Sequence, residues 1–129
     1  MIAVDTSALM AILLNEDTAD VCSSVLERED EILISAGTLS EALIVAAARG
    51  VAPQMRALVA GLGMQVVPVT GVTAQDVAVA YARWGRGHHP AGLNFGDCFG
   101  YALAERRGCP LLYVGQDFSQ TPVANALQP

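Results

Sequence analysis

The sequence contains no lysine, so all seven of its basic residues are arginines. A P-loop nucleotide site, a Schiff-base enzyme and a receiver domain each depend on a lysine, and these classes are therefore excluded. Positive charge is also scarce overall, because the net charge is −6 and the pI is about 4.6. Bulk charge cannot hold a nucleic acid here, although a local basic patch stays open.

Cysteines are few and have no metal-site spacing. The three, Cys22, Cys98 and Cys109, are odd in number and form no CxxC motif. A disulfide framework or a zinc site is therefore not expected. We expect buried, reduced thiols instead.

Long apolar runs are also missing, although the chain is apolar overall. No run approaches the roughly 20 apolar residues that a membrane helix needs. The first predicted helix follows Asp5 directly and leaves no segment for a signal peptide, so we expect a cytoplasmic protein without membrane contact. Apolar residues make up 53% of the chain, charged residues 16%, and the mean hydropathy is +0.41. Such a composition indicates that a partner covers some apolar surface.

Short apolar strands alternate with amphipathic helices along the chain. This alternation predicts an α/β fold in which a doubly wound parallel sheet is flanked by helices on both faces, as a single domain over residues 1–129. Ligands bind such sheets beyond the carboxyl ends of the strands. The predicted strands span 2–4, 32–34, 65–69 and 111–114, with a further short strand near 123–127; the predicted helices span 6–14, a segment beginning at 17 or 18, 38–49, a segment from 53, 73–84 and 95–107.

Four acidic residues lie where predicted strands end or where helices are otherwise apolar: Asp5, Glu41, Asp97 and Asp117. Carboxylates that converge in a fold repel one another and raise one another's pKa, unless a cation neutralises them. Oxygen ligands of this kind suit Mg²⁺ or Mn²⁺. The pattern therefore indicates a divalent metal site.

Each carboxylate also has an alternative reading as a helix cap or a turn residue. Thr38 and Glu41 have the spacing of a capping box, and so do Asn94 and Asp97. The other two could cap a helix and close a turn. Glu41 argues for a site, because burying it unpaired on an apolar helix would cost several kcal/mol. We expect it to face a polar cleft.

The order of these motifs resembles the PIN-domain ribonucleases, and within them the VapC-type toxins of bacterial toxin–antitoxin pairs. The likeness rests on residues 2–9, on Glu41, on the Asn-Phe-Gly-Asp-Cys segment 94–98 and on residues 111–118, and it covers the whole chain. Many members of that family carry an acid two residues before the last one, where this chain has Gly115. The fourth position therefore rests on Asp117 alone.

The resemblance implies a metal-dependent endoribonuclease that uses Mg²⁺ or Mn²⁺. It further implies a homodimer and a separate VapB-type antitoxin as partner. In the implied site, Asp5, Glu41, Asp97 and Asp117 are the catalytic and metal-binding residues. Thr6, Ser7 and Asn94 are expected around the metal and its water, where a hydroxyl of Thr6 or Ser7 would hold a metal-bound water; the alternative for both hydroxyls is helix capping.

The segment before Asn94 is the expected RNA-binding surface. Arg83 and Arg86 flank Trp84 in a glycine-rich stretch, and arginine beside an aromatic ring suits single-stranded RNA. The alternative is a solvated loop with Trp84 in the core. His88 and His89 are adjacent in sequence and share no helix face, so zinc is not expected there.

Two other functions stay open. A haloacid-dehalogenase-like phosphatase also begins with an aspartate after a strand, but it needs a second aspartate at the position of Ser7 and a lysine. A degenerate PIN-fold module for protein interaction would need none of the four acids, and their presence speaks against it.

Overall fold

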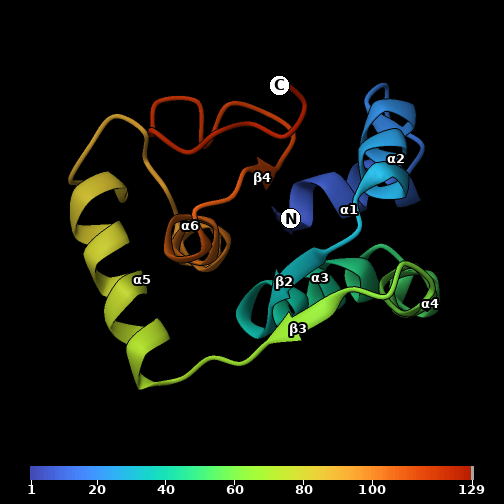
Figure 1. Cartoon of the computed structure of the whole chain (residues 1–129), viewed down its shortest axis with the longest axis horizontal. Coiled ribbons are helices and arrows are strands. Elements are labelled where there is room, and N and C mark those ends of the chain that lie inside the picture. The colour runs from blue at the N-terminus through green and yellow to red at the C-terminus, as the bar shows by residue number, and fades with distance from the viewer. Residues whose placement is uncertain (129) are drawn as a thin grey trace.

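The computed structural model describes residues 1–128 and contains one sheet of four parallel strands in the order β3–β2–β1–β4 (Figure 1). The chain lays β2 and β3 on one side of β1 and then returns to place β4 on the other side. This reversal confirms the predicted doubly wound α/β fold and makes the β1–β4 edge the switch point. The strands are β1 (Ile2–Val4), β2 (Ile32–Ser35), β3 (Gln65–Val67) and β4 (Leu111–Leu112).

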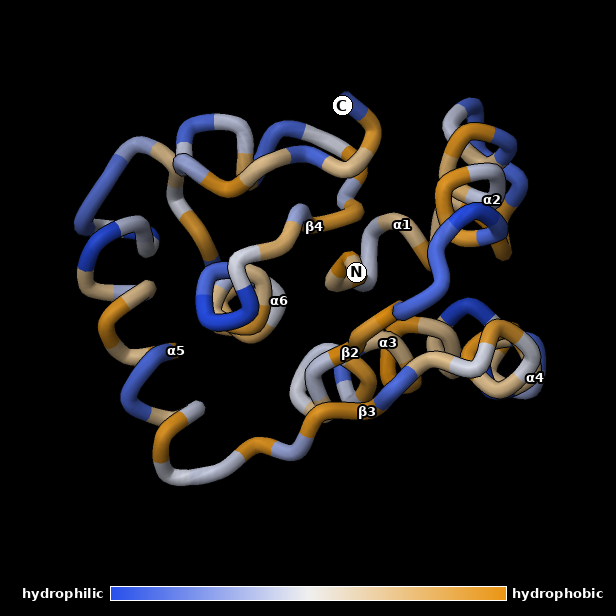
Figure 2. The backbone as a smooth tube through the Cα atoms, viewed as in Figure 1, coloured by the Kyte–Doolittle hydropathy of each residue, from blue (hydrophilic) through white to orange (hydrophobic). Residues whose placement is uncertain are grey.

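Six helices cover the two faces of the sheet. Helices α1 to α4 pack on one face over residues such as Val4 and Ile34, and α5 and α6 pack on the other over Ala3 and Leu33 (Figure 1). The tube is hydrophobic along much of β2 and β3, whereas α2 and α5 contain hydrophilic turns (Figure 2). The helices are α1 (Thr6–Leu13), α2 (Ala19–Arg28), α3 (Ala36–Ala48), α4 (Ala52–Gly61), α5 (Gly71–Trp84) and α6 (Phe95–Arg107).

The start of α3 differs from the prediction. Ser35 caps this helix, because its side chain accepts a hydrogen bond from the Gly37 amide at 3.2 Å. The helix therefore begins at Ala36, before Thr38, and the predicted capping box of Thr38 and Glu41 is wrong. Glu41 is left in the second turn, where its carboxylate is free for another role.

Three strand predictions were too long. Strands β3 and β4 end at Val67 and Leu112, earlier than the apolar runs suggest. The predicted strand near 123–127 is reduced to a single bridge between Leu111 and Asn125. After Leu112, the chain that leads to Asp117 is therefore a loop.

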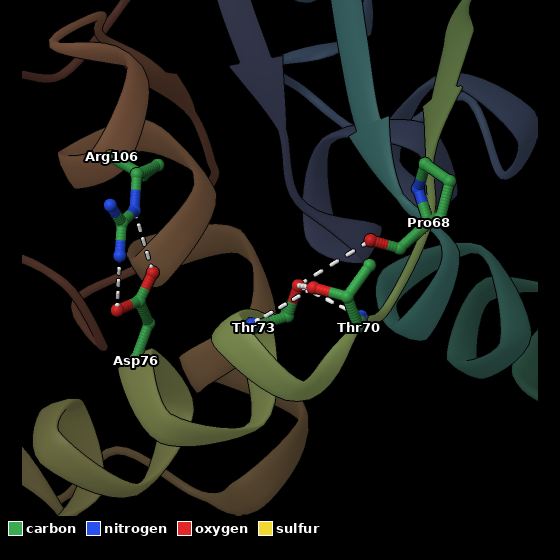
Figure 3. Close-up of polar contacts among 5 residues, drawn as sticks. All are labelled: Pro68, Thr70, Thr73, Asp76 and Arg106. Atoms are coloured by element: carbon green, nitrogen blue, oxygen red, sulfur yellow. Dashed lines mark hydrogen bonds and ion pairs between the residues drawn. The ribbon is translucent and has the colours of Figure 1, made fainter.

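Helix α5 is tied to α6 by an ion pair and capped at its own start (Figure 3). The Arg106 guanidinium donates to both carboxylate oxygens of Asp76, from Nε at 2.9 Å and from Nη2 at 2.8 Å. Thr70 and Thr73 form the capping box of α5, and Thr73 Oγ1 also donates to the Pro68 carbonyl at 3.4 Å. The ion pair joins α5 to α6, and the capping contacts fix the first turn of α5.

Within residues 1–128, no helix is both long enough and apolar enough to cross a membrane.

Candidate functional site

Asp5 lies at the carboxyl end of β1, at the switch point. Its amide donates to the Leu112 carbonyl at 2.9 Å, so the backbone continues the pairing with β4. Its Oδ2 caps α1 by accepting from the Ser7 amide at 3.1 Å and from the Ser7 hydroxyl at 2.7 Å. Its Oδ1 is buried and has no hydrogen-bond partner within residues 1–128. Helix capping therefore explains Oδ2 of Asp5 and leaves its Oδ1 unexplained.

Ser7 also fixes the chain that follows β4. The Val114 amide donates to Ser7 Oγ at 3.0 Å. The segment leading toward Asp117 is thereby tied to the residue that holds Asp5. One hydroxyl thus organises both carboxyl-end loops of the switch point.

Glu41 is held by a side chain of α1. Thr6 Oγ1 lies 2.8 Å from Glu41 Oε1 and 3.4 Å from the Thr38 carbonyl oxygen, and its one proton is donated between these two acceptors. Thr6 is buried and Glu41 is half-buried. Glu41 therefore faces a polar neighbour and caps no helix.

Asp97 is the third residue of α6 and forms a capping box with Asn94. The Asn94 amide donates to Asp97 Oδ2 at 3.0 Å, and the Asp97 amide donates to Asn94 Oδ1 at 2.8 Å. Burial raises the pKa of Asp97 to about 7, and the charges of Asp5, Asp117 and Glu41 add to this rise. Asp97 therefore does cap α6, as the alternative interpretation held. The capping hydrogen bond from Asn94 lowers the pKa of Asp97, so capping does not explain why that pKa is raised.

Two glycines of α6 lie against the carboxylates, and a side chain at Gly96 would displace one of them. A methyl group at Gly96 would overlap the Glu41 carboxylate, at 2.8 Å from its Cδ. One at Gly100 would lie 3.7 Å from Asp5 Oδ1 and 3.9 Å from Thr38 Oγ1. Asp97 lies between these two glycines in the sequence. Helix α6 thus lies against the Glu41 and Asp5 carboxylates and carries Asp97 in its own first turn.

Thr38 was missed as a member of this site. Its Oγ1 is fully buried and, like Asp5 Oδ1, has no hydrogen-bond partner within residues 1–128. The one-turn spacing of Gly96 and Gly100 was the available signal, because it marks where α6 is approached closely.

Asp117 lies at the margin of this cluster. It follows β4 by five residues and is exposed, although its charge raises the pKa of Asp97. Over residues 1–128, no three acidic, histidine or cysteine side chains already stand in position to share one ion. Asp5 also has a raised pKa, because burial disfavours its charged form and Glu41 repels it.

The residues fit a divalent cation in their chemistry. The donors are oxygens, one carboxylate oxygen is buried and unpartnered, and negative charges crowd around Asp97. Mg²⁺ binds through one or two carboxylates and keeps several waters, so it does not need three protein ligands already converged.

The two arginines of the predicted RNA-binding surface lie in the last turn of α5 and in the loop that follows it. Arg83 and Arg86 are exposed, and the Arg83 guanidinium lies 5.6 Å from the centre of the Trp84 ring. Trp84 itself is half-buried and packs on the core beneath α6, so the alternative reading holds for this residue. His89 Nδ1 accepts from the Ala91 amide at 3.0 Å and is used within the loop.

Comparison with known proteins places this fold in a family. The model of the PIN domain matches residues 2–124. The chain is 43% identical to ribonuclease VapC28 of Mycobacterium tuberculosis, with 96% of each chain covered. It is 40% identical to ribonuclease VapC30 of the same species, with 98% of each covered.

Solved structures share the fold at lower sequence identity. VapC20 of M. tuberculosis, described as a toxin that cleaves the sarcin–ricin loop, superposes with a TM-score of 0.78 at 19% identity, covering 96% of this chain and 97% of that one. VapBC2 of Rickettsia felis, bound to a promoter DNA fragment, gives a TM-score of 0.69 at 16% identity, covering 97% and 96%. Both likenesses confirm the fold.

The raised pKa of Asp97 predicts a pH-dependent stability in metal-free protein. Its pKa is about 7 in the folded state against an ordinary value of 3.8, so the folded state binds the proton more tightly. The carboxyl therefore stabilises the fold at low pH, and this contribution is lost as pH rises from about 4 to about 7. Asp97→Asn keeps an acceptor for the Asn94 amide and cannot titrate. We expect it to be more stable than wild type at about pH 8, by on the order of a few kcal/mol.

The measurement is urea unfolding in EDTA at several pH values. The advantage of Asp97→Asn should shrink as pH falls toward about 4, where both proteins are uncharged at this position. A stability difference that does not vary with pH would contradict the raised pKa.

Proposed function

The chain belongs to the PIN-domain family, among the VapC ribonucleases, and from this premise we propose that it hydrolyses RNA phosphodiester bonds with Mg²⁺ or Mn²⁺ held at Asp5, Glu41, Asp97 and Asp117. The supporting observation is the crowding of Asp5, Glu41 and Asp97 around the first turns of α6, with the pKa of Asp97 raised to about 7. Helix capping accounts for neither Glu41 nor the unpartnered oxygen of Asp5.

The chain's own residues orient the oxygens of this site. Ser7 fixes one oxygen of Asp5 and leaves Oδ1 free to bind a ligand. Thr6 orients Glu41, and the Asn94 amide orients Asp97. When bound, a divalent cation supplies an activated water and neutralises charge on the leaving oxygen. The first turn of α6 adds a positive helix dipole close to Asp97.

Substrate and partners follow from the relatives and from the surface. Arg83 and Arg86 are the proposed contacts to the RNA backbone, because they are exposed beside α6 while Arg106 is paired with Asp76. VapBC2 of R. felis is a toxin–antitoxin pair, and we propose a VapB-type antitoxin for this chain. A homodimer is also proposed, since the adjacent Ile44 and Val45 of α3 are 70% and 37% exposed and a contiguous apolar surface favours a covering partner.

Cleavage is expected to require both the cation and the acids. The purified protein should cut single-stranded or loop RNA with Mg²⁺ or Mn²⁺ and should not cut in excess EDTA. Asp5→Asn and Asp97→Asn should each lose activity with an unchanged circular dichroism spectrum, because each removes one charge while keeping size and cap geometry. Sequencing of the RNA ends identifies the cut.

Two results would contradict the proposal. Undiminished cleavage in EDTA excludes the metal. Inactive wild-type protein, tested free of antitoxin on total RNA, favours the degenerate interaction module. Asp30→Asn serves as the control, because this carboxylate is exposed before the start of β2, at the opposite end of the strand from the site.

Gly96→Ala tests whether the space in α6 serves the carboxylates. The added methyl overlaps the Glu41 carboxylate, which is the end of a flexible chain and can turn away. Stability should therefore change by no more than about 1 kcal/mol, while Glu41 leaves Thr6 and cleavage falls. Gly61→Ala is the control, because a methyl there meets no atom within 4 Å in the described structure.

A double-mutant cycle tests whether Gly96 affects cleavage only through Glu41. If Gly96 acts only through Glu41, adding Gly96→Ala to Glu41→Ala should cause no further loss of cleavage. Additive losses would show that Gly96 acts on something other than Glu41.

A further inference from the structure

Phe95 exposes a large aromatic ring in the first turn of the helix that carries Asp97. It is 67% exposed although it begins α6, two residues before Asp97. Its ring stands edge-on to Phe99 with the centres 5.0 Å apart, and Phe99 in turn packs on Gly37, where a methyl group would lie 2.5 Å from Phe99 Cγ. The exposed ring is thus supported from below. Neither helix capping nor core packing explains this exposure.

Phe95 borders a pocket that is also lined by an arginine side chain. The pocket is lined by Tyr81, Arg86, Asn94 and Phe95. Arg86 forms no ion pair within residues 1–128, whereas Arg106 is neutralised by Asp76. The pocket therefore combines two aromatic rings and an unpaired guanidinium at the end of α6 that carries Asp97.

The loop holds Arg86 in this position. The Arg86 amide donates to the Leu93 carbonyl at 2.9 Å, and the Leu93 amide donates to the Trp84 carbonyl at 3.0 Å. The Tyr81 hydroxyl donates to the Arg86 carbonyl at 3.4 Å. These bonds close the loop at its base. Arg86 thus leaves the backbone next to Asn94.

We propose that the Phe95 pocket, formed by Tyr81, Arg86, Asn94 and Phe95, binds one unpaired nucleobase of single-stranded RNA beside the phosphodiester that is cut. The base stacks on Phe95, and the Arg86 guanidinium contacts an adjacent phosphate. Stacking on an exposed aromatic ring accepts any base and needs an unpaired strand. This inference rests on the proposed ribonuclease function and assigns where its substrate is held.

The test compares two fluorescent oligoribonucleotides of equal length, one normal and one with abasic sites, by anisotropy in EDTA. Wild type should prefer the normal strand. Phe95→Ala should weaken binding of that strand by about five- to a hundredfold and leave the abasic strand unchanged, while Phe95→Tyr keeps the preference. Arg86→Ala should weaken both strands equally and lower the salt slope by about 0.7, one phosphate contact on a single strand.

Val21→Ala, at a 52% exposed position on the opposite face, is the matched control. An unchanged preference in Phe95→Ala overturns the proposal and assigns Phe95 to a protein contact. Equal weakening of both strands by Phe95→Ala also overturns it, because that pattern is structural. Binding is measured without a cation, so it does not depend on cleavage. If the protein prefers the normal strand but cleaves no RNA with Mg²⁺, the ribonuclease function is refuted and the nucleobase pocket is retained.

Discussion

The burial of carboxylates, to which their mutual repulsion adds, is the constraint on which the rest of this structure depends. Asp5 and Asp97 are 4% and 7% exposed, and each has its pKa raised by burial and by neighbouring acids. A fold selected for stability alone would place such groups in water, where repulsion is screened. Their burial is a cost in free energy that the proposed divalent cation would offset.

Three elements of the fold position the carboxylates. The β1–β4 switch point presents Asp5, α3 brings Glu41 from the side, and the first turn of α6 contributes Asp97 together with its helix dipole. Gly96 lets the Glu41 carboxylate approach that helix. One oxygen of each carboxylate is held by a hydroxyl or an amide, and Oδ1 of Asp5 is left without a partner in the described residues.

Much of this could be predicted from the sequence, because apolar periodicity sets the elements and α6 was predicted at its observed bounds of 95–107. The cap of α3 was predicted wrongly, since Thr38 and Glu41 have the right spacing while the competing signal from Ser35 depends on where β2 ends. Local pattern also missed Thr38 and Phe95, whose roles arise from packing between distant segments. The exposure of Asp117 could not be read from sequence, because loop paths depend on tertiary contacts.

Proton release on cation binding tests the central claim, that these acids are held together for a divalent metal, most directly. Ligation needs ionised carboxylates, and Asp97 with a pKa of about 7 is half-protonated at neutral pH. We predict that calorimetric titration with Mn²⁺ at pH 7, in two buffers of different ionisation enthalpy, releases at least about half a proton per bound ion, falling toward zero at about pH 9. Binding without proton release, or no binding, would contradict it.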